Sequence, residues 1–217
     1  MIQVNSITSV ILKISASALL LFCGSSWGQQ NLVSITEETL DAFNRVTAYE
    51  RVQSSLQRIM ETEPDTIREQ FRITEIPAPP YKEQKRATYF LEQMRVRGLK
   101  DAYLDDEGNV IGIRKGSGVG PTFLISAHLD TVFPEGTDTT VELRGGRYYA
   151  PGIGDDTRGL AALLSVIDTL NDSGIKTIGD VIFAGNVGEE GTGDLRGIKA
   201  IFRDFPSIDG YVSIDGT

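Results

Sequence analysis

The stretch PTFLISAHLDTV, residues 121–132, decides the fold. Its first half is a continuous apolar run, which is typical of a strand buried on both faces of a sheet. Two further runs of this kind follow, GDVIFAGNV at 179–187 and DGYVSIDG at 209–216. The segments between them, 159–174 and 193–205, are apolar at helical spacing. Strands that alternate with helices predict an α/β fold, a three-layer sandwich with a mainly parallel central sheet.

The part of the chain before this sheet is expected to be mainly helical. Apolar residues recur at helical spacing from Leu40 to Ile59, and SITE at 34–37 resembles a capping box that would start this helix. A second helix is expected to begin near Pro64, and a third to stop at Gly98. Residues 101–116 predict two short strands around a turn.

The composition of the 217-residue chain is that of a soluble globular protein, with 40% hydrophobic and 24% charged residues. Its net charge of −9 argues against nucleic acid or an anionic membrane surface as the main partner, because both select for basic patches. The acidic residues could instead bind a cation.

The first residues predict a signal peptide at 1–28, since a weakly basic start is followed by a short apolar run and then small residues. This favours a periplasmic or secreted protein without a membrane anchor after cleavage; the alternative is an N-terminal anchor that is never cut. The remaining chain divides into an N-terminal helical segment at 29–64 and a catalytic region at 65–217. Cys23, the only cysteine, lies in the signal segment, so no disulfide or Cys–metal chemistry is expected.

Each predicted buried strand ends in residues that a divalent-metal site needs. Ligands of open α/β sheets bind at the carboxyl ends of the strands, so these residues could face one cavity. They are His128 and Asp130 after the first strand, Asp155 and Asp156 in the loop before the helix, Glu189 and Glu190 after the second strand, and Asp215 after the third.

His128 is the only histidine of the chain. Residues two apart on an extended segment point to the same side, so Asp130 can accept a hydrogen bond from the ring N–H that does not contact metal. A lone histidine on an apolar strand can also be a satisfied core residue. The HxD spacing at the strand end favours the metal ligand.

Glu189 and Glu190 place two like charges side by side. Adjacent residues that leave a strand point in opposite directions, so one carboxylate can bind metal while the other faces substrate. A glutamate beside a metal-bound water can act as general base and then as general acid. Burial and the neighbouring charge should raise its pKa. The alternative is a solvated pair of loop residues.

The three aspartates have competing interpretations. A carboxylate at Asp155 or Asp156 can bridge two metals, as two-metal hydrolases require, and one of the two can instead be the N-cap of the following helix. Asp215 precedes a glycine, which suits a turn residue as well as a metal ligand.

Taken in order, these motifs resemble the zinc metallopeptidase family that includes peptidase T, glutamate carboxypeptidase, acetylornithine deacetylase and aminoacylase. The resemblance covers roughly residues 65–217 and implies the phosphorylase/hydrolase-like catalytic domain of an exopeptidase. It is carried by the segments ITEIPAPP, GNV, SAHLDTV, GIGDDTRGLAALL, GEEGTGDLRG and SIDG.

The resemblance also implies a role for each site residue. His128 and Asp215 would bind one zinc ion, Glu190 would bind the second, and Asp155 would bridge them. Glu189 would be the general base, and Asp130 would be the carboxylate that orients His128. Cobalt or manganese could replace zinc, because mixed imidazole and carboxylate ligands accept these ions.

One ligand of the family has no counterpart in this chain. The family's last histidine ligand follows an inserted lid domain, and the chain ends at Thr217 without a second histidine. The resemblance therefore implies a catalytic domain truncated before the lid, with an incomplete second metal site and no activity on its own. A homodimer is possible for the full-length protein, because the usual dimer contacts lie in the lid.

The predicted function is that of a dizinc hydrolase that cleaves amide or peptide bonds of small peptides or N-acyl amino acids. One alternative is a related zinc aminopeptidase without a lid, which shares a similar arrangement of ligands. Another is a catalytically inactive fragment that binds at most one metal ion well.

Overall fold

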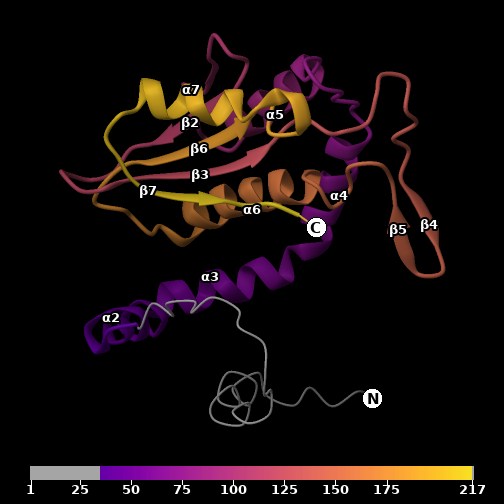
Figure 1. Cartoon of the computed structure of the whole chain (residues 1–217). Helices are drawn as coiled ribbons and strands as arrows, with labels where there is room; N and C mark the ends of the chain where they lie inside the picture. Colours follow the sequence, from indigo (N-terminus) through magenta and orange to yellow (C-terminus); the bar gives the residue numbers. More distant parts are fainter. Residues whose placement is uncertain (1–34, 217) are drawn as a thin grey trace, which may run out of the picture. The chain divides into compact units, whose positions relative to one another are not determined.

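The computed structural model describes residues 35–216 (Figure 1). The predicted signal peptide at 1–28, with Cys23, lies outside the described residues, and the division predicted at residue 65 stays a prediction. The chain forms two units, Met1–Leu40 and Asp41–Thr217, and the second contains the whole sheet. No helix in the described part is long and apolar enough to cross a membrane.

The N-terminal region contains two helices where the sequence predicts one. Helix α2 ends at Thr47, and Tyr49 then adopts an extended backbone as the N-cap residue of α3. The predicted capping serine, Ser34, lies outside the described residues, and Thr36 accepts the N–H of Thr39 at 3.2 Å in its place. The other two predicted helices are confirmed. The four helices are α2 (Glu37–Thr47), α3 (Glu50–Glu61), α4 (Glu63–Thr74) and α5 (Gln84–Val96).

The predicted α/β fold with a mainly parallel central sheet is confirmed. Within residues 35–216 this sheet has five strands in the order β1-β2-β6-β3-β7, and β3 is parallel to both β6 and β7. The antiparallel pairs are β1 with β2 and β2 with β6. A separate hairpin pairs β4 with β5. The strands are β1 (Tyr103–Leu104), β2 (Val110–Arg114), β3 (Thr122–His128), β4 (Glu142–Arg144), β5 (Arg147–Tyr149), β6 (Val181–Asn186) and β7 (Ile208–Ser213).

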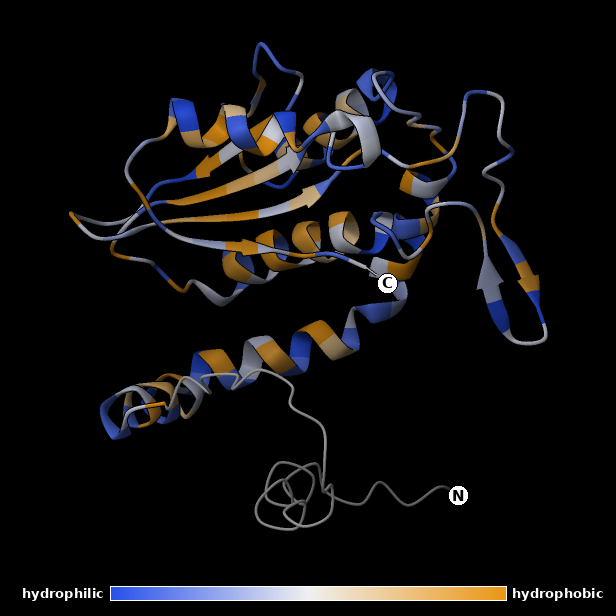
Figure 2. Ribbon diagram, in the orientation of Figure 1, coloured by the Kyte–Doolittle hydropathy of each residue, from blue (hydrophilic) through white to orange (hydrophobic). Residues whose placement is uncertain are grey.

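Two hydrophobic clusters make the fold a three-layer sandwich. Because side chains alternate along a strand, β6 sends Val181 and Phe183 to one face and Ile182 and Ala184 to the other. The first face is covered by α5 and by α6 (Thr157–Ser173), and the second by α7 (Arg196–Asp204). Figure 1 shows α6 and α7 on opposite sides of the sheet. Hydrophobic residues gather on the central strands and on α6 (Figure 2).

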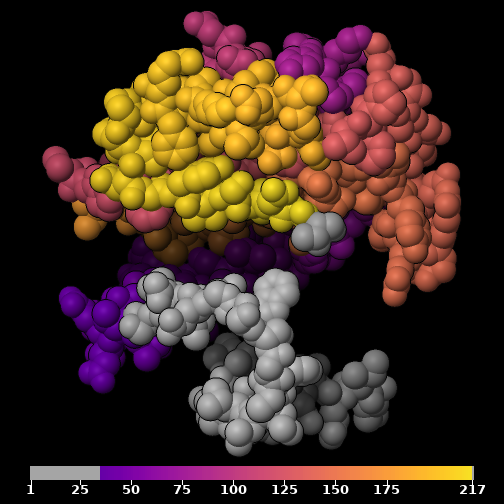
Figure 3. Space-filling view, in the orientation of Figure 1, coloured from indigo at the N-terminus to yellow at the C-terminus, as the bar shows by residue number. Residues whose placement is uncertain are grey.

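The third predicted strand is present, but the prediction that it is buried is wrong. Strand β7 lies at the edge of the sheet in the described chain, and four of its six residues are exposed. It shares the near surface with α7, as the yellow segment of Figure 3 shows. Tyr211 packs edge-on against Phe202 of α7, with ring centroids 5.4 Å apart, and both side chains stay partly exposed. An edge strand has one pairing partner, which explains the lower burial.

Candidate metal centre

The carboxyl ends of three parallel strands bring the predicted site residues together. His128 is the last residue of β3 and is level with Asn186, the last residue of β6. On the other side, the N–H of Ile214 donates to the carbonyl of Ser126 at 2.8 Å, which places Asp215 beside the end of β3. The Glu189–Glu190 pair follows β6 after a short turn. The register of the sheet therefore determines where these side chains meet.

His128 is the centre of the cluster. Its Nδ1 donates to the backbone carbonyl of Asp130 at 3.0 Å, and its Nε2 lies 2.8 Å from Oδ1 of Asp155 and 3.8 Å from Oδ1 of Asp215. Because a carbonyl oxygen can only accept, Nδ1 carries a proton and Nε2 is the nitrogen available to a metal. Burial alone would lower the pKa of His128, but Asp130, Asp156 and Asp155 raise it to about 10.

The two adjacent aspartates have different surroundings. Asp156 is fully buried, and both of its oxygens are occupied: Oδ1 accepts the N–H of Gly159 at 2.9 Å and Oδ2 accepts the N–H of His128 at 3.0 Å. It is the N-cap of α6. Asp155 is half exposed and points its carboxylate at the His128 ring. Asp155 therefore has the freer carboxylate of the two, and its role as a bridge between two metals stays a prediction.

Asp130 contacts the glutamate loop rather than the histidine ring. Its Oδ1 accepts the N–H of Glu189 at 3.0 Å, and its Oδ2 accepts the N–H of Glu190 at 2.9 Å. The carboxylate lies 3.7 Å from Nδ1 of His128, beyond hydrogen-bond distance, and the Asp130 backbone carbonyl makes the predicted contact instead. The reason is that two backbone N–H groups hold the carboxylate in a different direction. Asp130 thus links the histidine to the glutamates.

The two glutamates have raised pKa values. Burial raises the pKa of Glu189, and Asp215, Asp130 and Asp155 raise it further against the opposing charge of His128. Burial also raises the pKa of Glu190, as do Asp155 and its neighbour Glu189. The rise for Glu189 agrees with the predicted direction, whereas the sequence prediction was that the metal-binding partner, Glu190, stays ionised. Glu189 also lines a cavity of about 410 Å³ whose other walls include Phe202 of α7 and Tyr211 of β7.

Among the residues that the structure describes, two groups of side chains have the geometry for a metal ion. In each group the ligand atoms lie within 4.8 Å of one another. The first group is His128, Asp155 and Glu190, and the second is His128, Asp156 and Asp215. Both oxygens of Asp156 already accept backbone N–H groups, so the first group and Asp215 offer the freer oxygens. Imidazole nitrogen with carboxylate oxygens is a donor set that zinc accepts.

Arg86, which is not among the residues predicted from the sequence, lies under the site. It is fully buried in α5 and donates from Nη1 to the carbonyl of Leu129 at 2.7 Å and from Nε to the carbonyl of Ile76 at 2.9 Å. Burial lowers its pKa to about 10, although Asp130 and Asp156 oppose the shift. Arg86 therefore supplies a positive charge beneath the two buried aspartates. Its position on the apolar face of a predicted helix is the feature of the sequence that could identify it as a buried charge.

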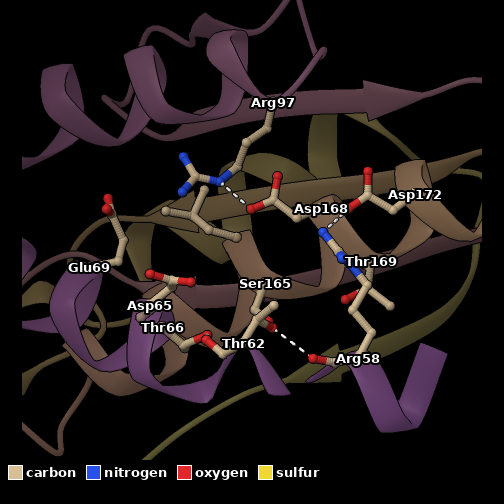
Figure 4. Close-up of a pocket in the computed structure, with 12 residues that line it drawn as sticks. Arg58, Thr62, Asp65, Thr66, Glu69, Arg97, Ser165, Asp168, Thr169 and Asp172 are labelled. Atoms are coloured by element: carbon tan, nitrogen blue, oxygen red, sulfur yellow. Dashed lines mark hydrogen bonds and ion pairs between the residues drawn. The ribbon is translucent and has the colours of Figure 1, made fainter. Parts of the chain in front are cut away.

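A second cavity, of about 300 Å³, lies among α3, α4 and α6 (Figure 4). Its charged side chains pair with each other: Arg97 binds Asp168 at 2.9 Å, and Arg58 binds Asp172. It contains no metal-binding group of the kind found at the strand ends, as far as the described residues show. The candidate site is therefore the cluster of metal-binding side chains at the carboxyl ends of the strands, and not this cavity.

Comparison with known proteins supports the predicted family. Residues 124–215 match Peptidase family M20/M25/M40. The chain is 35% identical over 122 residues to a protein of Pyrococcus abyssi named as a LysW-lysine/LysW-ornithine hydrolase, and the match covers 55% of this chain and 32% of that protein. It is 33% identical over 112 residues to carboxypeptidase G2 of a Pseudomonas species, with coverage of 49% and 27%. The matched regions thus make up about a third or less of these relatives.

Solved structures show the same fold. Aminopeptidase PepT of Bacillus cereus has a TM-score of 0.58 and 22% identity, over 70% of this chain and 43% of that one. The dipeptidase Dug1p of Saccharomyces cerevisiae has a TM-score of 0.62 and 18% identity, over 75% and 40%. At this identity the likeness concerns the fold, and it confirms the predicted α/β sandwich.

Proposed function

Because residues 124–215 match Peptidase family M20/M25/M40, we propose that this protein is a metal-dependent hydrolase of amide or peptide bonds in small peptides or N-acyl amino acids. The observation that carries the proposal is the convergence of His128, Asp155 and Glu190, whose ligand atoms lie within 4.8 Å of one another at the strand ends. The names of the Pyrococcus and Pseudomonas relatives support this class of substrate.

The proposed metals are two zinc ions, which cobalt or manganese could replace. His128 and Asp215 would hold one ion, Glu190 would hold the other, and Asp155 would lie between them. The donors support this because Nε2 of His128 faces both Asp155 and Asp215, while the ring is fixed from behind through Nδ1. When bound, such ions polarise a substrate carbonyl and increase the acidity of water.

Glu189 is the group that we propose to move the proton. Its raised pKa brings the carboxylate closer to the pH at which it can both accept and return a proton, which is the requirement for a general base that becomes a general acid. Its backbone N–H is held by Asp130, so the main chain at this position is fixed. The cavity beside Glu189 offers room for a substrate.

One observation favours a second candidate function. The sequence contains one histidine, so a second metal ion in this chain would have only carboxylate ligands such as Asp155 and Glu190. Carboxylates alone suit magnesium, calcium or manganese better than zinc. The second candidate is therefore a metal-binding module that holds one zinc ion well and does not hydrolyse amides.

The test combines metal analysis with hydrolysis. The protein is loaded with zinc or cobalt, and bound metal is counted by mass spectrometry while amine release is measured with dipeptides and N-acetyl amino acids. Replacing Glu189 by glutamine should lower the rate by about 10²–10⁴-fold with the metal retained. Glu135→Gln is the matched control, because Glu135 is exposed and pairs with Lys82.

The outcomes separate the two candidates. Hydrolysis by wild type and by Glu135→Gln, lost in Glu189→Gln, supports the hydrolase. One bound metal ion with no hydrolysis in any variant supports the metal-binding module. A wild-type protein that binds no divalent metal contradicts both.

A further inference from the structure

The loop that carries Glu189 and Glu190 includes backbone conformations that are unfavourable for residues with a side chain. It connects β6 to α7 and includes the 3₁₀ turn η1 (Gly191–Gly193). Asp194 and Leu195, which are not glycines, have φ values of +52° and +55°. Residues with side chains rarely adopt this left-handed conformation unless the surrounding structure imposes it. The shape of the loop therefore depends on contacts from elsewhere in the fold.

Arg196 makes the main contacts on one side of this loop. It donates from Nη2 to Oε1 of Glu83 at 2.9 Å, and its Nε forms an ion pair with Oε1 of Glu107 at 3.1 Å. Its guanidinium lies 4.9 Å from the ring centre of Tyr81. Glu83 is only 1% exposed, so removing Arg196 would leave a buried carboxylate without this partner. Arg196 thus has a fixed position at the start of α7.

The fixed guanidinium packs directly against the residue before the glutamates. A Cβ placed on Gly188 would lie 1.9 Å from Nη1 of Arg196, so only glycine fits there. Gly188 also has a φ of +63°. Nη1 is buried against the loop, and in the described part of the chain it has no hydrogen-bond partner.

Tyr81 holds the other end of the same loop. Its hydroxyl donates to the carbonyl of Thr192 at 2.6 Å, two residues after Glu190. Its own backbone has a φ of +63°, and its N–H donates to Oε1 of Glu83 at 3.2 Å. Tyr81 and Arg196 therefore share Glu83 as a common anchor, and they contact the loop before and after the two glutamates.

From these contacts we infer that Arg196, with Glu83 and Tyr81, is a positioning group that sets the direction of the Glu189 and Glu190 side chains. Asp130 holds the N–H groups of both glutamates from the side of His128. Arg196 and Tyr81, anchored by Glu83, contact the residues on either side of the two glutamates, so the loop is held from two directions. This inference rests on the proposed function, in which Glu190 binds metal and Glu189 moves the proton.

The test replaces Arg196 by methionine, which keeps an unbranched side chain and removes the charge. Arg203→Met is the matched control, because Arg203 lies on the same helix, is exposed and pairs with its neighbour Asp204. Hydrogen exchange of the peptide 187–195 reports the order of the loop. Cobalt titration with the visible absorption spectrum reports the number and arrangement of ligands around the ion.

Arg196→Met should speed exchange in 187–195 and weaken cobalt binding by about 10–100-fold, with a changed spectrum, as is typical when a group that orients a metal ligand is lost. Arg203→Met should change neither. Glu83→Gln keeps an oxygen acceptor for Arg196 and should fall between wild type and Arg196→Met. A change in overall stability alone would not alter the cobalt spectrum, so this readout separates positioning from folding.

Tyr81→Phe covers the case in which Arg196→Met does not fold. It keeps the ring beneath the guanidinium and removes one hydrogen bond, to Thr192. Faster exchange at 187–195 in this variant supports the inference. Exchange and a cobalt spectrum identical to wild type in Tyr81→Phe, and in Arg196→Met where it folds, overturn it. If wild type binds no cobalt, the proposed function fails. The exchange data still decide whether Arg196, Glu83 and Tyr81 order the loop.

Discussion

Replacing Asp130 by asparagine tests how much one buried carboxylate contributes to the site. Asp130 is fully buried and uses one oxygen for each of two N–H groups, those of Glu189 at 3.0 Å and Glu190 at 2.9 Å. Asparagine has one acceptor oxygen, and its NH₂ group would face the other donor. One charge-assisted hydrogen bond is lost and one buried N–H is left unpaired. Since a hydrogen bond to a charged group is worth about 1.5–3 kcal/mol, the variant should lose about that much stability.

The assay is urea unfolding of the metal-free protein, followed by circular dichroism. Asp138→Asn is the control, because Asp138 is exposed and only caps a local turn through the N–H of Thr140. Burial would raise the pKa of Asp130, but His128 and the two glutamate N–H groups together hold it below the ordinary value. A lowered native pKa stabilises the fold above the unfolded pKa and loses this effect as pH falls. The difference between wild type and Asp130→Asn should therefore be largest near pH 7 and shrink below about pH 4.

Two results would refute this reasoning. Equal stability of Asp130→Asn and wild type at pH 7 would mean that the two hydrogen bonds contribute nothing net. A difference that grows as pH falls would mean that Asp130 is protonated in the native state, contrary to its contacts.

Three further predictions concern neighbouring residues. Gly188→Ala should destabilise the fold by about 1–3 kcal/mol, because the new Cβ would meet Arg196 and the backbone at this position is left-handed. Thermal unfolding measures this loss. Gly136→Ala is the control, because Gly136 is also left-handed but lies in open space, so the comparison separates the steric clash from the backbone strain. Asp156→Ala should cost about 1–2 kcal/mol through the lost N-cap of α6, and urea unfolding measures it; a neutral effect would contradict the cap. Zinc affinity should rise from pH 6 to pH 8, because the pKa of His128 near 10 means that zinc must displace a proton from Nε2. Calorimetry in buffers of different ionisation enthalpy should show this proton release. Its absence would contradict the assignment of His128 as a metal ligand.

The sequence predicts the centre of the site well because strand periodicity controls it. Once β3, β6 and β7 are parallel and in register, the residues that follow them must meet at one edge, and His128 and Asp215 do so. The sequence leaves Asp156 as a competing candidate beside Asp155, since either can cap a helix. Only the structure shows that Asp156 uses both oxygens on backbone N–H groups.

Other features depend on contacts between distant segments, which periodicity does not encode. Arg86 is separated by 43 residues from Leu129, whose carbonyl it binds, and Tyr81 by 111 residues from Thr192. The exposure of β7 depends on its place in the strand order, which a list of apolar runs does not give. The Asp130 carboxylate was assigned to the histidine because both lie on one strand, and the competing donors come from a different loop.

The arrangement of the carboxylates explains why two adjacent glutamates can exist at this strand end. Asp130 and Asp156 form an inner pair that is fully buried, with every oxygen accepting a backbone N–H and with Arg86 beneath. These contacts hold the pKa of Asp130 below its ordinary value, whereas burial raises the pKa of Asp156 to about 7 against the opposing N–H groups of His128 and Gly159. The outer carboxylates, Asp155, Glu190 and Asp215, are partly exposed and share the single positive charge of His128. A divalent cation would reduce their mutual repulsion further, so we expect such an ion to bind to the outer group and to leave the inner pair in place.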